Sequence, residues 1–414
     1  MMNESVCSVF RDKVKRLFHW GPISTIWIIF FITLTSLYST LHVAPPCSSL
    51  LGLFLSTCIF SFFYMTLKSY LCTVFVGPGF VPLGWRPCDP SAEQKLQFCN
   101  VCRGFKPPRA HHCRACNRCI MKMDHHCPWI NTCCGHLNHK YFLIFLLFAP
   151  FGCITSCISL SLSIYQSPAI FPSLLLRRFQ SSVLFVIADL MITLFALGLA
   201  VGVALSVGIL AIFQLKAVSR NQTGIESWIV AKANVWRKDI GEKKPFRYPY
   251  DLGKLVNFQQ IFLWSGKVLG DGYYWPVVKG CTQYDLTLEQ IYQKRLKQKI
   301  QRTFKITQNY DGSRCMCFRY GCLTAIRSPC FEEPRISVRV GDALMVTRGT
   351  KYWIYGHLVP SESCSADFSD SVRIRGLIIV FLFENNCYWV PWTSFFRHSS
   401  LHIYWSIWFL HAME

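Results

Sequence analysis

The chain has 414 residues, of which 52% are hydrophobic and only 16% are charged, with a mean hydropathy of +0.28. Soluble domains carry about 25% charged residues, so this composition argues against an ordinary soluble enzyme and excludes a disordered chain. The 43 Lys and Arg against 22 Asp and Glu give a net charge of +21. On so apolar a chain, that charge predicts contact with an anionic membrane leaflet or an anionic cofactor rather than with nucleic acid.

Four apolar runs are long enough to cross a bilayer. They lie at Ser24–Val43, Ser49–Val76, Tyr141–Tyr165 and Ser182–Leu215. A helix rises 1.5 Å per residue, so about 20 apolar residues span the hydrocarbon core. Buried core helices are the alternative, but four such runs in the first half of the chain favour membrane helices.

Basic residues flank these runs in segment 1–23, in the loop 77–140 and after Lys216. The positive-inside rule therefore places all three regions in the cytoplasm. The expected organisation of this half is a cytoplasmic N-terminus 1–23, a helical hairpin 24–76, a cytoplasmic cysteine-rich domain 77–140 and a second helical pair 141–216.

The remaining chain changes to a soluble character. Within the cytoplasmic region 217–310, apolar residues recur every four positions at Leu288, Tyr292, Leu296, Ile300 and Phe304. This spacing predicts an amphipathic helix. The segment is rich in Lys and Arg, so the helix either lies on the lipid surface or packs on its own domain.

Residues 313–360 alternate in polarity and turn often, as at Gly341–Asp342 and Gly349, which predicts a small β-barrel within the domain 313–375. The hydrophobic tail 376–414 receives no assignment from its pattern, and no internal repeat is apparent in the sequence. Four cysteines before or within the barrel are either acylation sites or ordinary free thiols: Cys315, Cys317, Cys322 and Cys330.

Eight of the 22 cysteines lie between Cys99 and Cys134, in a basic segment that also holds histidines. An extracellular disulfide framework is one explanation for so many cysteines. The C-x-x-C spacing instead predicts zinc ligation in a reducing compartment. Two C-x-x-C pairs, each needing two further ligands, predict two four-ligand sites with cysteines and histidines to spare.

The sequence Asp124-His125-His126-Cys127 combines metal-ligand residue types with those of a nucleophilic site. Side chains alternate along an extended chain, so His126 faces away from His125 and Cys127. A thiol beside an imidazole is an activated nucleophile, and an acid behind the imidazole fixes its tautomer. The alternative is that all these cysteines and histidines are structural zinc ligands.

Residues 99–142, which include KPPRAHHCRACNRCIMKMDHHCPWINTCCGHLNHKYF, resemble the cysteine-rich domain of the DHHC protein S-acyltransferases, or palmitoyltransferases. The resemblance implies a polytopic α-helical membrane protein. Four transmembrane helices would enclose a lipid chain, and a two-zinc domain between helices two and three would sit beneath them on the cytoplasmic face. It also implies that Cys127 is the acylated nucleophile, His125 its base and Asp124 the partner of His125.

The same resemblance implies two structural zinc ions with three cysteines and one histidine each. The first would be held by Cys99, Cys102, His112 and Cys119. The second would be held by Cys113, Cys116, His126 and Cys133.

Two further matches follow the fourth apolar run. Thr223–Glu226 resembles the family's TTxE segment, but Gly224 stands where the family has a threonine that braces the catalytic aspartate. Residues 250–262 resemble the family's aromatic–Asn motif, with Asn257 in register and Leu263 in place of a glycine. The strand-rich region 313–375 resembles a variant SH3 domain, and the combination resembles the endoplasmic-reticulum member of the family.

The activity that the resemblance implies is a two-step acyl transfer. An acyl group, such as palmitate, would pass from acyl-CoA to Cys127 and then to cysteines of membrane proteins at the cytoplasmic face. Both termini of this multi-pass protein would be cytoplasmic, and the SH3-like domain could bind a protein partner. The alternative is a zinc-containing membrane scaffold without catalysis. An intramembrane metalloprotease is disfavoured because the sequence has no HExxH, and no nucleic-acid partner is expected.

Overall fold

The computed structural model describes residues 14–167, 183–262, 270–299, 301–312, 335–349, 353–359 and 375–379. The chain forms two compact units. The first comprises residues 1–228 and 247–287, and the second comprises residues 229–246 and 288–414.

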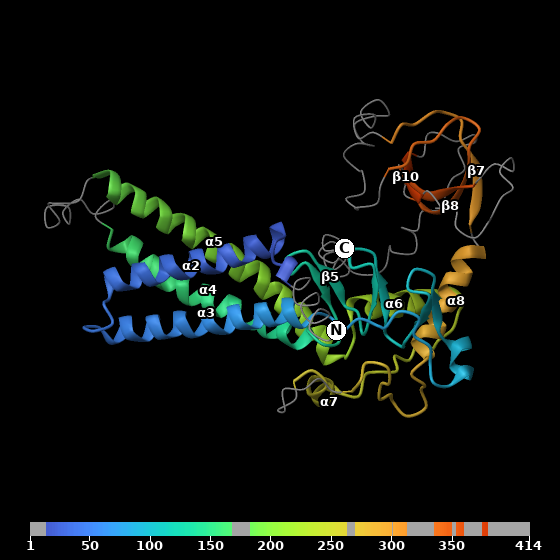
Figure 1. Cartoon of the computed structure of the whole chain (residues 1–414), viewed down its shortest axis with the longest axis horizontal. Helices are drawn as coiled ribbons and strands as arrows, with labels where there is room; N and C mark the ends of the chain where they lie inside the picture. Colours follow the sequence, from blue (N-terminus) through green and yellow to red (C-terminus); the bar gives the residue numbers. More distant parts are fainter. Residues whose placement is uncertain are drawn as a thin grey trace, which may run out of the picture. The chain divides into compact units, whose positions relative to one another are not determined.

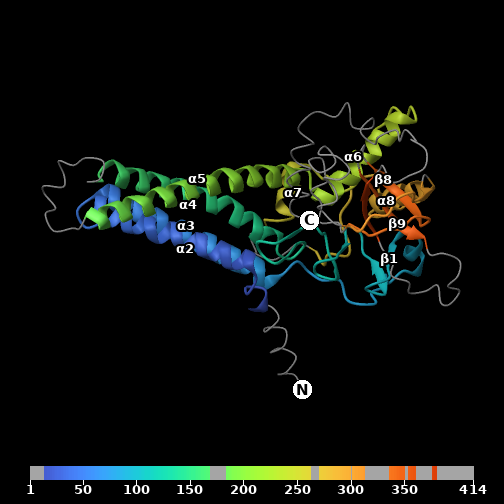
Figure 2. The same cartoon turned by 90° about the horizontal axis from the view of Figure 1, so that it is seen from above.

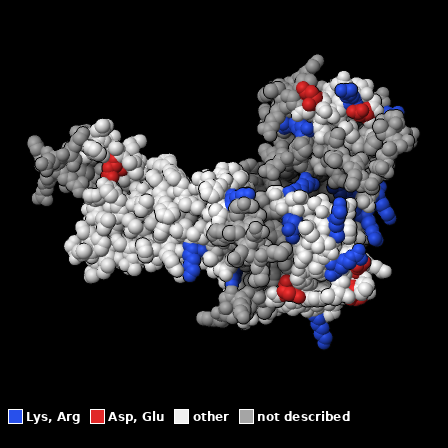
Figure 3. Space-filling model, viewed as in Figure 1, with Lys and Arg blue, Asp and Glu red and all other residues white. Residues whose placement is uncertain are grey.

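Four long helices form one part of the first unit: α2 (Trp20–Val43), α3 (Leu50–Val76), α4 (His139–Tyr165) and α5 (Val183–Ser219). All four are long and apolar enough to cross a membrane, which confirms the four predicted spans. They lie side by side in both views (Figures 1 and 2). Over them, the surface in Figure 3 is almost free of Lys, Arg, Asp and Glu. A helix that is apolar on all sides is typical of a membrane span.

Small polar side chains hold two of these helices together inside the bundle. Thr40 Oγ1 on α2 lies 2.6 Å from Ser159 Oγ on α4, and Ser159 donates to the carbonyl oxygen of Ser36 at 3.0 Å. Small and hydroxylated residues are typical of packed membrane helices because they let the backbones approach closely. The bundle interior between α2 and α4 is therefore fastened by hydrogen bonds.

Between α3 and α4 the chain forms a short 3-10 helix, η1 (Pro90–Lys95), and three β-hairpins. The hairpins pair β1 (Gln97–Cys99) with β2 (Gly104–Lys106), β3 (His111–Cys113) with β4 (Arg118–Ile120), and β5 (His125–Cys127) with β6 (Thr132–Cys134).

The three hairpins are copies of one another at a spacing of 14 residues. Their closing pairs are Cys99–Gly104, Cys113–Arg118 and Cys127–Thr132. Each turn ends on a non-glycine residue with a positive φ: Arg103, Asn117 and Asn131, at 52°, 50° and 49°. The expectation of no internal repeat is therefore wrong. Few positions are identical in all three hairpins, but the second and third share His-His-Cys, at 111–113 and 125–127, and an opposed cysteine, Cys119 and Cys133, so the repeat is present in the sequence.

The third hairpin is anchored to the ends of the helices. Tyr70 of α3 donates its hydroxyl to the carbonyl oxygen of Trp129 at 2.8 Å. The buried Asn138 amide donates to the carbonyl oxygens of Cys133 and Thr73, at 2.9 and 3.1 Å. Hydrogen bonds from α3 and from the start of α4 thus set the position of the turn that follows Cys127.

After α5 come α6 (Gly224–Asp239) and α7 (Lys254–Gln259). Asn257 is fully buried. Its amide donates to the carbonyl oxygen of Ser219, at the end of α5, and its Oδ1 accepts from the Leu252 N–H. The Asn of the aromatic–Asn motif therefore ties α7 to the last membrane helix. Leu263 lies outside the described residues.

Most of α8 (Asp285–Lys299) belongs to the second unit, where Gln293 donates to the carbonyl oxygen of Ile229 on α6 at 3.0 Å. The helix ends before Phe304, so extending the predicted amphipathic helix that far is wrong. Phe304 lies in strand β7 (Arg302–Lys305) opposite the buried Leu344. A residue that pairs with a buried partner in a sheet buries more apolar surface than one in an exposed last helical turn, which accounts for the difference.

The C-terminal sheet has four antiparallel strands in the order β10-β9-β8-β7, where β8 is Ala343–Gly349, β9 is Trp353–Val359 and β10 is Arg375–Ile379. Within the described residues β7 and β10 are free edges, so the structure shows a small sheet but not a closed SH3-like barrel. The sheet also exceeds the predicted range 313–375, because strand β7 lies before residue 313 and strand β10 extends beyond residue 375. The four cysteines from Cys315 to Cys330 and the rest of the tail lie outside the described residues.

Gly21, in the first turn of α2, tests how tightly the helix is seated on the third hairpin. A Cβ at Gly21 would lie 2.1 Å from the carbonyl oxygen of Pro128, whereas one at Gly198 on α5 would meet nothing within 4 Å. We expect Gly21→Ala to destabilise the protein by about 1–3 kcal/mol through overpacking, measured as a lower midpoint of thermal unfolding in detergent.

The matched control is Gly198→Ala, which should leave that midpoint unchanged or raise it, since alanine favours a helix. Equal effects of the two substitutions would contradict the tight seating of α2.

Candidate active site

Two groups of four cysteine and histidine side chains converge in the hairpin region. They are Cys99, Cys102, His112 and Cys119, and Cys113, Cys116, His126 and Cys133. Each group combines the C-x-x-C turn of one hairpin with a directly opposed His–Cys pair from the next. The opposed pairs are His112 with Cys119 and His126 with Cys133.

The second hairpin contributes to both groups because adjacent residues on a strand face opposite sides. His112 points to the first group and Cys113 to the second. The two groups are therefore interlocked, and removing either would loosen the hairpin that they share.

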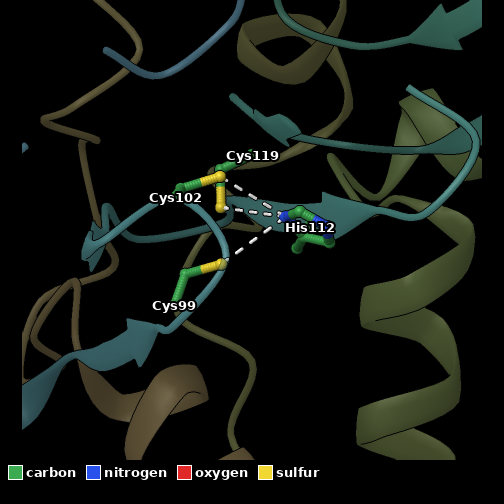
Figure 4. A group of neighbouring side chains, drawn as sticks. All are labelled: Cys99, Cys102, His112 and Cys119. Atoms are coloured by element: carbon green, nitrogen blue, oxygen red, sulfur yellow. Dashed lines mark hydrogen bonds between the residues drawn. The ribbon is translucent and has the colours of Figure 1, made fainter. Parts of the chain in front are cut away.

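The distances within each group suit a tetrahedral zinc ion. In the first, His112 Nδ1 lies 3.5, 3.4 and 3.8 Å from the sulfurs of Cys99, Cys102 and Cys119 (Figure 4). In the second, the corresponding distances from His126 Nδ1 to Cys113, Cys116 and Cys133 are 3.6, 3.4 and 3.6 Å. Ligand atoms around a tetrahedral zinc lie about 3.6–3.8 Å apart, given the usual Zn–S and Zn–N distances. Both groups thus fit zinc in donor type and in spacing.

Cys127 closes the third hairpin in the position that Cys99 and Cys113 occupy in the first two. The second cysteine of their C-x-x-C turns is replaced here by Ile130, which is buried. No fourth hairpin follows to supply an opposed His–Cys pair, because the chain enters α4 at His139. Neither four-residue group includes Cys127.

The two faces of the third hairpin carry different residues. His126 and Cys133 point to the second metal-ligand group. On the opposite face lie His125, Cys127 and Cys134, with Cys134 directly across from His125. All three are at most 2% exposed. A single strand therefore holds a metal ligand on one side and a thiol–imidazole pair on the other.

Asp124 stands behind His125 and is held by three donors. His125 Nδ1 lies 2.8 Å from Asp124 Oδ2, which also accepts from Gln214 Nε2 at 2.9 Å. Asp124 Oδ1 accepts from the Gly224 N–H at 2.7 Å. Burial raises the pKa of Asp124, but the hydrogen bonds and nearby charge outweigh it and hold the pKa well below the usual range. Asp124 is therefore a buried carboxylate anion.

The helix α6 supplies the backbone donor through a capping box. Thr223 Oγ1 accepts from the Glu226 N–H, and Glu226 Oε2 accepts from the Thr223 N–H. This reciprocal pairing is how a T-x-x-E sequence starts a helix. The Gly224 N–H is then left at the positive end of the helix, where it favours the Asp124 carboxylate. Although Gly224 lacks the hydroxyl of the family's threonine, its backbone braces the aspartate directly.

His125 is oriented so that its second nitrogen is free for chemistry. Its Nε2 is buried and has no hydrogen-bond partner among the described residues, and its ring packs edge-on against Phe142 of α4 at 5.4 Å. Burial lowers the pKa of His125, but Cys134, Asp124 and Cys127 together raise it well above its usual value. An imidazole of this kind readily holds a proton taken from a neighbouring thiol.

A buried ion pair fastens the first residues of α6 to the hairpins. Arg109 donates to both carboxylate oxygens of Glu226, at 2.6 and 2.8 Å, and both side chains are fully buried. The guanidinium carbon lies over the rings of Tyr250 and Trp275, 4.4 and 4.7 Å from their centroids. Burial opposes the charge on Arg109, but the Glu226 carboxylate raises the pKa of Arg109 above its usual value. The cluster fixes the capping box that aims the Gly224 N–H at Asp124.

Gln214 and Arg109 escaped the sequence-based search for site residues. Gln214 lies in the fourth apolar run. A lone polar residue near the end of a membrane helix often has a functional role, and this signal could have identified it. Arg109 is one of many basic residues, so no signal separated it from the others. Of the sequence-derived residues, the structure brings Asp124, His125 and Cys127 together and gathers all eight cysteines and histidines of the two metal-ligand groups.

The model of the DHHC palmitoyltransferase family matches residues 92–230. The chain is 42% identical to Palmitoyltransferase ZDHHC6 of Danio rerio and 41% identical to that of Homo sapiens. These matches cover 88% and 89% of this chain, and 90% and 92% of the relatives. It is also 30% identical to Probable protein S-acyltransferase 14 of Arabidopsis thaliana, over 54% of this chain and 70% of that protein.

The chain therefore belongs to the DHHC palmitoyltransferase family. It is a multi-pass membrane enzyme that transfers acyl groups to proteins.

The Arg109–Glu226 pair should be essential for stability. Glu226→Gln leaves a buried, uncompensated arginine while the glutamine can still close the capping box. We therefore expect a loss of about 3–5 kcal/mol, seen as a lower unfolding midpoint. The control is Glu93→Gln at the exposed Arg86–Glu93 pair, which should cost at most about 1 kcal/mol. Similar losses at the two pairs would contradict this role.

Lys122 should make stability depend on pH. Its side chain is buried, and burial lowers the pKa of Lys122 from 10.5 to about 7, helped by the nearby charge of Arg109. Between those pH values the unfolded chain binds the proton and the folded chain does not, so this group's contribution to stability improves as pH rises.

We expect Lys122→Met to raise the unfolding midpoint relative to wild type at pH 7, and this advantage should shrink steadily as pH rises toward 10.5. A difference that stays constant or grows with pH would refute this.

Proposed function

We propose that this palmitoyltransferase works through an acyl-enzyme on Cys127, with His125 as its base and Asp124 as the group that orients His125. The observation that carries the proposal is the 2.8 Å contact between His125 Nδ1 and Asp124 Oδ2. Since Nδ1 carries the proton that Asp124 accepts, Nε2 is the nitrogen left to take the thiol proton.

The two transfer steps follow from this arrangement. In the first, His125 Nε2 accepts the Cys127 proton, the thiolate attacks the acyl-CoA carbonyl carbon, and the CoA thiolate leaves and is protonated by His125. In the second, a substrate cysteine gives its proton to His125 and attacks the Cys127 thioester, and the Cys127 thiolate leaves and takes that proton back from His125. The Asp124 carboxylate stabilises the imidazolium in both steps without taking its proton.

Zinc has a structural role in this proposal. Four thiol or imidazole donors per group, with no position left for water or substrate, are typical of structural zinc sites. When bound, the two ions would hold the three hairpins in register. The residues that we assign to them are Cys99, Cys102, His112 and Cys119, and Cys113, Cys116, His126 and Cys133.

The acyl chain of acyl-CoA would enter among the four membrane helices. Each buried methylene contributes about 0.8 kcal/mol to binding, and the ring of Phe142 on α4 contacts His125, so a chain end emerging there would present its thioester to the site. Basic residues of segment 77–140 and of the chain after Lys216 would bind the CoA phosphates.

We place the protein in the endoplasmic-reticulum membrane with both termini cytoplasmic, because its basic residues flank the helices on one side and it resembles the family's endoplasmic-reticulum member. Its substrates would be membrane proteins with cytoplasmic cysteines. The four-stranded C-terminal sheet supports an SH3-like module that binds a protein partner.

Cys127→Ser tests the nucleophile. Purified protein incubated with an alkyne-labelled palmitoyl-CoA should take up hydroxylamine-labile label in the wild type and none in Cys127→Ser. Zinc content should stay near two ions per chain in both, because Cys127 belongs to neither ligand group.

Cys133→Ser is the matched control, since it removes a cysteine of the second group on the same hairpin and should lower the zinc content. A zinc-containing scaffold predicts no label in the wild type. Loss of zinc from Cys127→Ser would instead make Cys127 a ligand.

A further inference from the structure

Gln214 links the end of the fourth membrane helix to the acidic member of the site. Its side chain is 6% exposed. Its Nε2 donates to Asp124 Oδ2 at 2.9 Å, and its Oε1 lies 3.3 Å from Nε2 of His139 at the start of α4. One amide on α5 thus contacts the start of α4 and the residue before the third hairpin.

The chemistry of the partners fixes which way this amide points. Asp124 is an anion that only accepts hydrogen bonds, so it must face the NH₂ group of Gln214. The amide oxygen then faces His139, whose Nε2 must carry a proton to donate to it. The resulting chain of donors runs from His139 through Gln214 to Asp124, and it ends on the same oxygen that receives His125 Nδ1.

We propose that Gln214 is a positioning residue for acyl transfer that holds Asp124 Oδ2 in line with His125 Nδ1. The proposal rests on the proposed roles of Asp124, His125 and Cys127. Gln214 and the Gly224 N–H together supply the brace at a site where the usual threonine hydroxyl is absent.

Two physical reasons make this brace necessary. First, Asp124 is 2% exposed, so water cannot replace a donor that is lost. A buried carboxylate oxygen that accepts no hydrogen bond costs free energy. Second, the Asp124 carboxylate can rotate about its Cβ–Cγ bond, and only one rotation angle points Oδ2 toward His125. The Gly224 N–H restrains Oδ1 alone, whereas Gln214 restrains the oxygen that meets the imidazole.

The test compares Gln214→Met and Gln214→Glu in single-turnover acylation of Cys127 by palmitoyl-CoA. Methionine keeps the length of the side chain but donates nothing. Glutamate keeps an acceptor for His139 but places a second anion against Asp124.

We expect the maximal rate of acyl-enzyme formation to fall at least about tenfold in Gln214→Met and further in Gln214→Glu. The palmitoyl-CoA concentration giving half the maximal rate should be unchanged.

Gln298→Met, an identical replacement at an exposed position of α8, is the control and should keep the wild-type rate. Three measurements distinguish a positioning role from a folding defect: the rate constant of acylation of the active molecules, the burst amplitude, which gives the fraction of active molecules, and the zinc content. A purely structural role would lower the amplitude or the zinc content and leave the rate of the remaining active molecules unchanged.

Either that result, or a wild-type rate in Gln214→Met, would overturn the proposal. Failure of the underlying function is distinguishable, since then even the wild type would show no label that depends on Cys127.

Discussion

The alternation of side chains along three residues of one short strand, β5, is the constraint on which the rest depends. His126 is directed to a metal-ligand group, while His125 and Cys127 face the other way. A slip of one residue would exchange these faces and place the thiol among the ligands. The closely spaced sulfur and nitrogen atoms around His126 prevent that slip, because each four-residue group has only one register in which its atoms converge.

The three-fold repeat accounts for a cysteine that closes a hairpin but belongs to neither metal-ligand group. Each of the first two hairpins ends its first strand on a ligand cysteine and borrows an opposed His–Cys pair from the next hairpin. No hairpin follows the third one. Cys127 therefore has the turn geometry of a ligand cysteine but no opposed His–Cys pair to complete a metal-ligand group. The chain instead enters α4, whose Phe142 contacts His125. The acylation site that we propose thus lies where the hairpin repeat ends and α4 begins.

Electrostatics in the site are supplied from far along the chain. The carboxylate of Asp124 is surrounded by a side-chain amide from α5, a backbone N–H from α6 and the neighbouring imidazole. The Arg109–Glu226 pair holds α6 in place through the capping box. Each of these donors is already oriented before substrate arrives, so none needs to reorganise during transfer. The low exposure of the cluster also keeps water from competing for the same lone pairs.

Much of the fold could be predicted from the sequence, because its signals are local. Runs of apolar residues mark the four long helices, and C-x-x-C spacing marks two groups of converging cysteine and histidine side chains. The T-x-x-E pattern marks the start of α6. The end of α8 was mispredicted because Phe304 continues a helical spacing while its actual partner, Leu344, lies 40 residues away. The closed barrel expected over 313–375 is not seen in the described strands.

By itself, the sequence determined the residue types of the site and their order, since metal ligands, a thiol, an imidazole and an acid lie within 36 residues. Only the tertiary structure decided which of them meet. The brace on Asp124 comes from Gln214 and Gly224, 90 and 100 residues away. Residue spacing predicts which chemical groups lie close together along the chain. Tertiary packing determines which donors bind a buried carboxylate, because only a folded core brings distant donors to it.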